Sequence, residues 1–156
     1  MEYVILLKTF IAAGLGAVIG FEREMSHKVA GLRTHTLVCM ASALLTSLAI
    51  DGFIEYLGTT PYDPSRIVSN IIVGIGFIGA GAILRQGSRV QGTTTAASLW
   101  AVAAVGITVG LGFFREAAVV AAVIFLILRF LRATEEKIIS KLRHMDGEEP
   151  DESTEE

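Results

Sequence analysis

The sequence predicts an all-α membrane protein, built as a polytopic bundle of about five transmembrane helices, from two observations. Of its 156 residues, 52% are hydrophobic, a larger share than most water-soluble domains carry. The apolar residues also gather in runs of roughly 17 to 20, the length that crosses a hydrocarbon core of about 30 Å. The lipid bilayer is therefore the expected solvent, and the composition argues against a soluble enzyme.

The apolar runs define the five spans. In chain order they are expected at residues 3–21, 35–50, 70–84, 94–110 and 116–131. The first run meets charged residues with no small-x-small cleavage site before them, so we expect a retained helix and not a signal peptide. Lys8 within it is expected to extend toward the nearer interface.

The third span, NIIVGIGFIGAGAIL, is the richest in glycine. Its glycines are Gly74, Gly76, Gly79 and Gly81. At about 100° per residue they fall on several sides of a helix, and small residues let neighbouring membrane helices come close. We therefore expect the third helix to be central and these four glycines to serve helix packing.

Residues 74–79 also form a literal GxGxxG pattern. The dinucleotide-binding fingerprint needs a strand before it, a helix after it and an acidic residue about 20 positions on. Here the segment stays apolar beyond the glycines, and position 99 is leucine. Close helix packing is therefore the better interpretation than nucleotide binding.

The basic residues predict an orientation. Ten lysines and arginines fall in the first loop, the third loop and the tail, whereas the opposite loops hold Arg66 and Arg115. Because cytoplasmic loops carry the excess of basic residues, we predict a multi-pass protein of the plasma (inner) membrane. Its N-terminus is expected outside and its C-terminal tail in the cytoplasm.

Three regions follow from these patterns. Residues 1–132 form the predicted transmembrane helical domain, and residues 133–145 a juxtamembrane basic, amphipathic helix. Residues 146–156 are acidic and almost without apolar side chains, a composition typical of disorder.

The predicted cytoplasmic ends of the spans collect polar side chains. The candidates for a functional surface there are Glu22, Arg23, Arg33, Thr34, Arg85, Thr94 and Thr95. In a bundle these groups would meet, and Glu22 or Glu24 is expected to pair with Arg33 or Arg85. The alternative is ordinary anchoring by basic residues together with threonine helix caps.

Other polar residues allow two interpretations each. Asn70 at the start of the third span either links helices by hydrogen bonds or has a functional role. The acids Asp51, Glu55, Asp63 and Glu116 are expected to face outward as solvated loop residues. The alternative is that they attract a divalent cation, since Mg²⁺ prefers oxygen ligands.

Chemistry beyond this is not indicated. The three histidines are not at metal-ligand spacing, and no nucleophile-and-base pair or nucleic-acid module is visible. We expect a protein that is not an enzyme and has no cofactor. If the protein binds Mg²⁺, the sequence does not identify the residues that hold the ion. The expected partners are the lipid bilayer and either further copies of the chain or another membrane protein.

Three segments together resemble the membrane domain of the MgtC/SapB family. They are EREMSHKVAGLRTHTLV at residues 22–38, IVGIGFIGAGAILRQG at residues 72–87 and VQGTTTAASLWAVAAVGITVGLG at residues 90–112. The resemblance extends over nearly the whole chain up to about Leu131. It implies a bacterial-type inner-membrane protein of about five spans that is associated with magnesium homeostasis and, in pathogens, with survival inside host cells.

The resemblance also implies functional positions. Beyond the residues already named, matching motif positions add Gly31, Leu32 and Trp100 to the candidate surface. Members of the family often have Asn where Thr94 stands, so any role that needs an amide there does not carry over. Many members also have a soluble C-terminal domain of ferredoxin-like type, and we expect this chain, which continues into an acidic tail, to act without it.

Two functions are therefore weighed. The first is a regulatory membrane protein of low-magnesium adaptation that binds another membrane protein, since some members of the family are thought to restrain the membrane ATP synthase. The second is an oligomeric transporter or channel for Mg²⁺ or another ion, because transporters use glycine-interrupted spans. The sequence favours the first, since no carboxylate is expected mid-membrane, where an ion pathway would need one.

Overall fold

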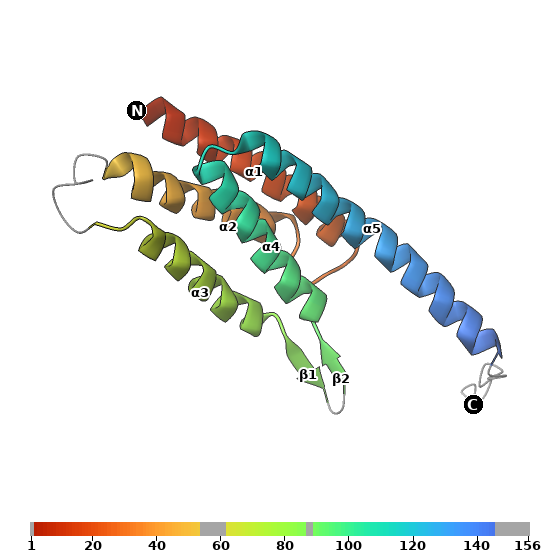
Figure 1. Cartoon of the computed structure of the whole chain (residues 1–156). Helices are drawn as coiled ribbons and strands as arrows, with labels where there is room; N and C mark the ends of the chain where they lie inside the picture. The colour runs from red at the N-terminus through yellow and green to blue at the C-terminus, as the bar shows by residue number, and fades with distance from the viewer. Residues whose placement is uncertain (1, 54–61, 87–88, 146–156) are drawn as a thin grey trace. The chain divides into compact units, whose positions relative to one another are not determined.

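A computed structural model of the chain describes residues 2–53, 62–86 and 89–145. Its elements are α1 (Glu2–Met25), α2 (Leu32–Ser47), the π-helical turn η1 (Leu48–Gly52), α3 (Ser65–Gly81), β1 (Leu84–Gln86), β2 (Arg89–Gln91), α4 (Thr93–Gly110) and α5 (Phe114–Met145), as drawn in Figure 1. The predicted all-α bundle of five helices is confirmed. A short antiparallel hairpin, in which Leu84 pairs with Gln91, stands where we expected only a loop. The predicted acidic tail lies outside the described residues.

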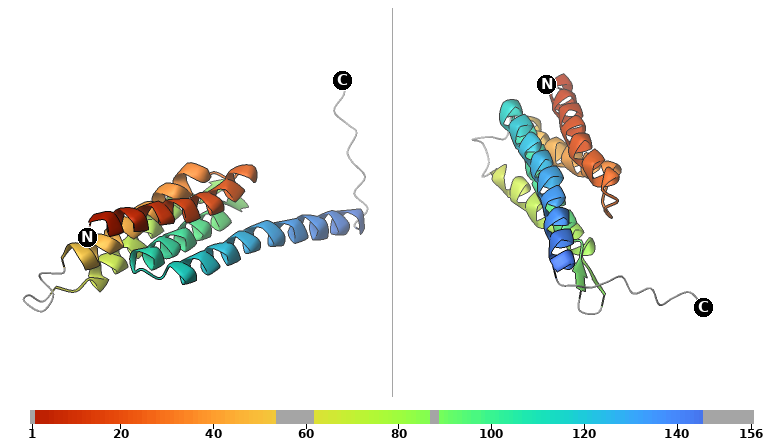
Figure 2. Two further views of the ribbon diagram at one scale, coloured as in Figure 1. Left: turned by 90° about the horizontal axis from the view of Figure 1, so that it is seen from above. Right: turned by 90° about the vertical axis from the view of Figure 1, so that its right-hand side faces the viewer.

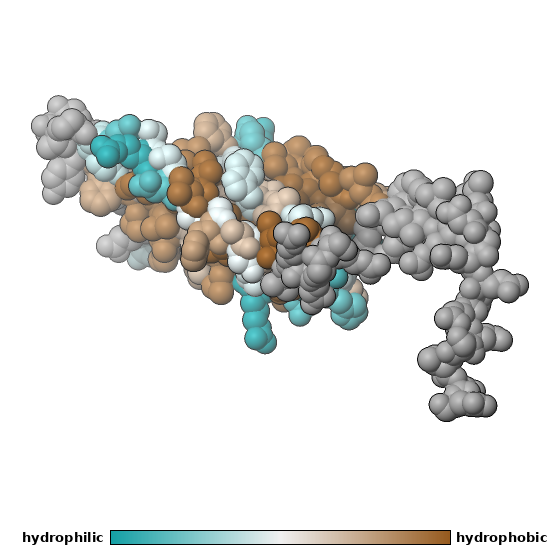
Figure 3. Space-filling model, turned by 90° about the horizontal axis from the view of Figure 1, so that it is seen from below, coloured by the Kyte–Doolittle hydropathy of each residue, from teal (hydrophilic) through white to brown (hydrophobic). Residues whose placement is uncertain are grey.

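The membrane assignment is also confirmed. Within the described residues, three helical segments are long and apolar enough to cross a bilayer, Tyr3–Met25, Leu32–Gly52 and Thr93–Gly110, and α3 is a shorter apolar helix. Large apolar side chains lie exposed, among them Tyr3, Phe10 and Phe77 at 86%, 74% and 85%. Figure 3 shows one face of the molecule on which apolar side chains predominate. Such a surface suits lipid and not water.

By its internal contacts the chain divides into two units, Met1–Phe125 and Leu126–Glu156. The division falls within α5. Everything described below lies in the first unit.

The centre of this first unit is α2, which packs against both α1 and α4 (Figures 1 and 2). A Cβ atom added at Gly16 of α1 would lie 2.6 Å from the Cβ of Cys39, and one at Gly106 of α4 would lie 2.2 Å from the Cys39 carbonyl oxygen. Gly20 and Gly110, one turn further along their helices, approach α2 equally closely. Glycines four residues apart lie on one face of a helix, so each pair allows close contact between backbones.

The glycine-rich helix α3 is not central in this unit, contrary to our expectation. Among the described residues, nothing lies within 4 Å of a Cβ added at Gly74, Gly76 or Gly81, whereas one at Gly79 would lie 3.6 Å from the Cβ of Ala96 on α4. The principal partner of α3 is α4. Because the four glycines point in several directions, Gly79 is the one that comes within 4 Å of another helix in the part of the chain that the structure describes.

An ion pair joins α1 to the π-helical turn. Lys8 Nζ lies 2.7 Å from Asp51 Oδ2, and the two side chains are 9% and 25% exposed. We had expected Lys8 to extend to the interface and Asp51 to be a solvated loop acid. The ion pair shows that both expectations were wrong. A lysine and an aspartate within apolar helices are tolerated because each neutralises the other.

Candidate functional site

The C-terminal end of α1 carries a buried ion pair. Arg23 contacts the carboxylate of Glu22 through Nε and Nη2, and the two residues are 1% and 4% exposed. Ser26, one turn after Glu22, donates from Oγ to Glu22 Oε1 at 2.8 Å. Since an unpaired buried charge is strongly destabilising, these groups depend on one another.

The expected pairing of Glu22 or Glu24 with Arg33 is not observed, and the side chain of Arg85, the other expected partner, lies outside the described residues. Glu22 pairs with its neighbour Arg23, and Glu24 Oε2 accepts a hydrogen bond from the backbone N–H of Leu32 at 3.0 Å. Leu32 is the first residue of α2, so the Glu24 carboxylate lies at a helix N-terminus, where negative charge is favoured. A Cβ atom added at Gly31 would overlap this carboxylate, so a side chain there would displace the end of the Glu24 side chain.

A second group of buried polar contacts connects α2 to α4 through His35. His35 is 0% exposed. Its Nδ1 lies 2.9 Å from the Gly31 carbonyl oxygen, and its Nε2 lies 3.0 Å from Ser98 Oγ. Because a carbonyl can only accept, Nδ1 donates to the Gly31 oxygen. Ser98 Oγ also lies 2.8 Å from the Thr95 carbonyl oxygen.

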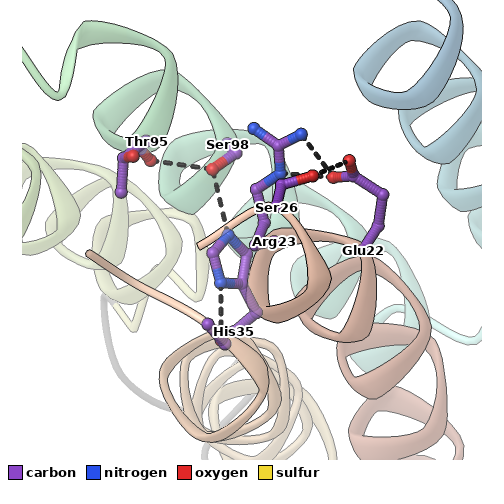
Figure 4. Close-up of polar contacts among 7 residues, drawn as sticks. Glu22, Arg23, Ser26, His35, Thr95 and Ser98 are labelled. Atoms are coloured by element: carbon purple, nitrogen blue, oxygen red, sulfur yellow. Dashed lines mark hydrogen bonds and ion pairs between the residues drawn. The ribbon is translucent and has the colours of Figure 1, made fainter. Parts of the chain in front are cut away.

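Together these residues form the buried polar cluster, defined as Glu22, Arg23, Ser26, His35, Thr95 and Ser98. Figure 4 shows them converging from α1, α2, α4 and the turn after α1. Lys8 and Glu22 are about 21 Å apart along α1 at 1.5 Å per residue, which is less than the thickness of the hydrocarbon core. The Lys8–Asp51 pair and the buried polar cluster therefore cannot both lie outside the hydrocarbon of a bilayer that α1 spans.

The residues that we predicted to form one functional surface do not all lie together in the structure. Glu22, Arg23, Gly31 and Thr95 are buried, and Thr34 is half-buried. Arg33, Leu32, Thr94, Asn70 and Trp100 are exposed, Trp100 by 52%. Arg85 lies on β1. Only Glu22, Arg23 and Thr95 belong to the buried polar cluster.

Asn70 lies elsewhere, in a groove between α2 and α3. The α2–α3 groove has a volume of about 560 Å³, and its walls include Leu37, Leu45, Asn70, Gly74 and Ile78. Its lining is almost entirely apolar apart from Asn70 and Ser42. Asn70 is thus available to an occupant of the groove and does not link α3 to the buried polar cluster.

Ser26, His35 and Ser98 are the members of the cluster that the sequence did not lead us to select. His35 stands four residues after Gly31, which places its ring one helical turn above that carbonyl. A histidine within the first turn of an apolar span, with a serine in a second span, was the available signal. Nothing in the sequence spacing showed that His35 and Ser98, 63 residues apart, would meet.

The fold and the cluster define a class: a multi-pass helical membrane protein with a buried polar network at one end of closely packed spans. Within that class the chain belongs to the MgtC family, whose model it matches over residues 9–137. It is 36% identical over 142 residues to "Putative magnesium transporter YhiD" of Escherichia coli (strain K12), across 90% of this chain and 66% of YhiD.

Other relatives are named "Protein MgtC". The chain is 38% identical over 133 residues to that of Salmonella typhimurium (strain LT2), across 85% of this chain and 54% of the relative. It is 42% identical over 120 residues to that of Brucella abortus (strain 2308), across 76% and 47%. The chain thus spans from about half to just under two thirds of these curated relatives. No solved structure matches it.

Proposed function

We propose that this chain acts in magnesium homeostasis, in adaptation to low magnesium, by binding and regulating another membrane protein. The family membership and the magnesium transporter named among its relatives support the magnesium part of this proposal. The proposal involves no catalysis and no cofactor. The membrane is the plasma (inner) membrane, with the N-terminus outside and the tail cytoplasmic, as the distribution of basic residues indicates.

The observation that carries the regulatory proposal is the open face of α3. Among the described residues, nothing lies within 4 Å of a Cβ atom added at Gly76 or Gly81, and Val73 and Phe77 beside them are 72% and 85% exposed. Small residues flanked by large apolar ones are the surface that membrane helices use to dock closely. The membrane ATP synthase is the partner that the family resemblance suggests.

An oligomeric transporter of Mg²⁺ or another ion is the second candidate. It is supported by the name of YhiD and by the α2–α3 groove, where Asn70 adds an amide to apolar walls. Polar groups facing a cavity at membrane depth mark ion and substrate pathways in other proteins.

Partner capture in native membranes tests the regulatory function. Photocrosslinking from position 77 should trap a membrane protein at low external magnesium, and Gly76→Leu should abolish the product by blocking close approach. Asn70→Leu is the matched control on the same helix, because it also adds an apolar side chain but lies in the groove. Failure to trap any protein, or equal trapping with Gly76→Leu, would contradict the regulatory function.

Flux into liposomes tests the alternative. Purified protein is reconstituted with an internal Mg²⁺-sensitive dye, and the rate is compared with that of empty vesicles. The result that favours transport is a rate of Mg²⁺ entry above that of empty vesicles. This rate should be lost with Asn70→Ala and retained with Gly76→Leu, and such a result would replace regulation as the main function.

A further inference from the structure

A polar cavity lies beside the buried polar cluster, and nothing in the proposed function uses it. It has a volume of about 340 Å³. His27 and Lys28 line it from the turn after α1, Gln91 and Gly92 from the segment before α4, and Thr95 from the first turn of α4. We propose that this cavity binds a phosphoryl group, either as free phosphate or as the headgroup of a phospholipid.

The first support comes from Thr95. Its side chain is 2% exposed and lines the cavity. Its carbonyl oxygen accepts from Ser98 Oγ, but its hydroxyl has no hydrogen-bond partner among the described residues. Because Thr95 lines the cavity, this hydroxyl is available to a ligand there.

The second support comes from the backbone around Thr95. α4 begins after Gly92, which has a φ of 90° and provides no side-chain cap. The Ala96 N–H bonds to the Gly92 carbonyl oxygen at 2.9 Å, whereas the N–H groups of Thr93, Thr94 and Thr95 have no backbone acceptor in the part of the chain that the structure describes. Free N–H groups at the positive end of an 18-residue helix favour an anion.

The charge of the lining agrees with an anion. Lys28 contributes a cation and His27 a ring that can donate, and no carboxylate is among the described residues that line the cavity. The nearby acids are engaged elsewhere, Glu22 with Arg23 and Ser26, and Glu24 with the Leu32 N–H. A phosphoryl group has enough acceptor oxygens to use the ammonium, the hydroxyl and the backbone N–H groups together.

The position of the cavity fits both sources of the group. It lies after the membrane-spanning segment Tyr3–Met25 and at the start of the segment Thr93–Gly110, where lipid headgroups meet protein. A bound group would touch the first turn of α4 next to the Thr95–Ser98–His35 contacts, so its binding would stabilise the α2–α4 interface. This inference does not depend on the proposed partner.

The test is a binding measurement on the full chain purified in a detergent that contains no phosphate group. Inorganic phosphate is titrated in equilibrium dialysis, and in a second arm the protein is reconstituted in vesicles of equal parts phosphatidylcholine and phosphatidylglycerol before native mass spectrometry of retained lipid. Saturable phosphate binding identifies the free anion. Retained phospholipid without phosphate binding identifies the headgroup.

Lys28→Gln and Thr95→Val are each expected to weaken whichever binding occurs by about tenfold, the factor that loss of one charge-assisted hydrogen bond produces. Arg66→Gln removes an exposed cation outside the cavity and should leave the affinity unchanged. The proposal is overturned if neither probe binds, if Lys28→Gln binds as the native chain does, or if Arg66→Gln weakens binding equally. Unchanged melting of Lys28→Gln, whose side chain is exposed, confirms that the affinity change is not a folding defect.

Discussion

Gly106 on α4 and Gly76 on α3 are both glycines within apolar helices, yet they have opposite surroundings. A methyl group at Gly106 would overlap the Cys39 carbonyl of α2, whereas none of the described residues lies within 4 Å of one at Gly76. The first glycine allows two helices of the same chain to touch. The second leaves a smooth surface on the outside. The comparison shows that glycine content alone does not identify the centre of a membrane bundle, whereas two glycines four residues apart mark a helix face that packs closely against a neighbouring helix.

The largest expected effect is in the buried polar cluster, which lies among the closely packed helices α1, α2 and α4. Arg23→Leu leaves the Glu22 carboxylate buried without its cation, and losses of this kind cost about 3–5 kcal/mol. We expect a correspondingly lower free energy of unfolding in detergent. Arg33→Leu, at an exposed arginine, is the control, and equal destabilisation by the two variants would contradict the pairing.

Gly106→Ala should destabilise the chain by about 1–3 kcal/mol, because overpacking against backbone forces helices apart. Thermal or denaturant unfolding of the purified protein measures it. Gly74→Ala, in open space, should change stability by no more than about 0.5 kcal/mol, as surface substitutions do. If the two alanine variants melt alike, the contrast between α4 and α3 is wrong.

Gly76→Leu tests whether the open face of α3 tolerates a large side chain. We expect near-native unfolding, within about 0.5 kcal/mol, together with loss of partner capture. This differs from the expectation for a central helix, in which a leucine would disrupt the bundle. Substantial unfolding caused by Gly76→Leu would restore the central position to α3.

The smallest effect concerns the start of α3. Hydrogen bonds from the Ser65 hydroxyl and backbone N–H hold the pKa of Asp63 below its usual value. A depressed pKa contributes stability that is present above the unfolded-state pKa of about 3.9 and is lost as the pH falls through the folded-state pKa. The Ser65 amide resonance should therefore shift with a midpoint below that value, and Asp63→Asn should remove the shift. A midpoint at or above it would contradict the contact.

The helices were predictable because hydrophobic length is a local property of the chain. The buried polar cluster was predictable only in part. Glu22, Arg23 and Thr95 stood out as polar residues at span ends, but Glu22 and Arg23 turned out to satisfy one another instead of a distant arginine. Lys8 and Asp51 were expected to reach water, because their contact joins residues 43 positions apart and no local pattern encodes it.

The position of the glycine-rich helix could not be read from composition for a related reason. A glycine lets another helix approach closely on the side that the glycine faces. The sequence does not show on which side of α3 another helix lies. Gly16 with Gly20 and Gly106 with Gly110 share the four-residue spacing that gives each pair a common face. The glycines of α3 lack a comparable repeated spacing toward one neighbour.

Spin labelling tests the contrast between α2 and α3 most directly. A nitroxide is attached at Gly76→Cys in a Cys39→Ala background, with one chain in each lipid nanodisc, and its collision rate with dissolved oxygen is measured. A mobile label that is as accessible to oxygen as one at Phe77→Cys is the expected result. An immobilised, oxygen-protected label at position 76 would show that α3 is enclosed by its own chain and would contradict the account.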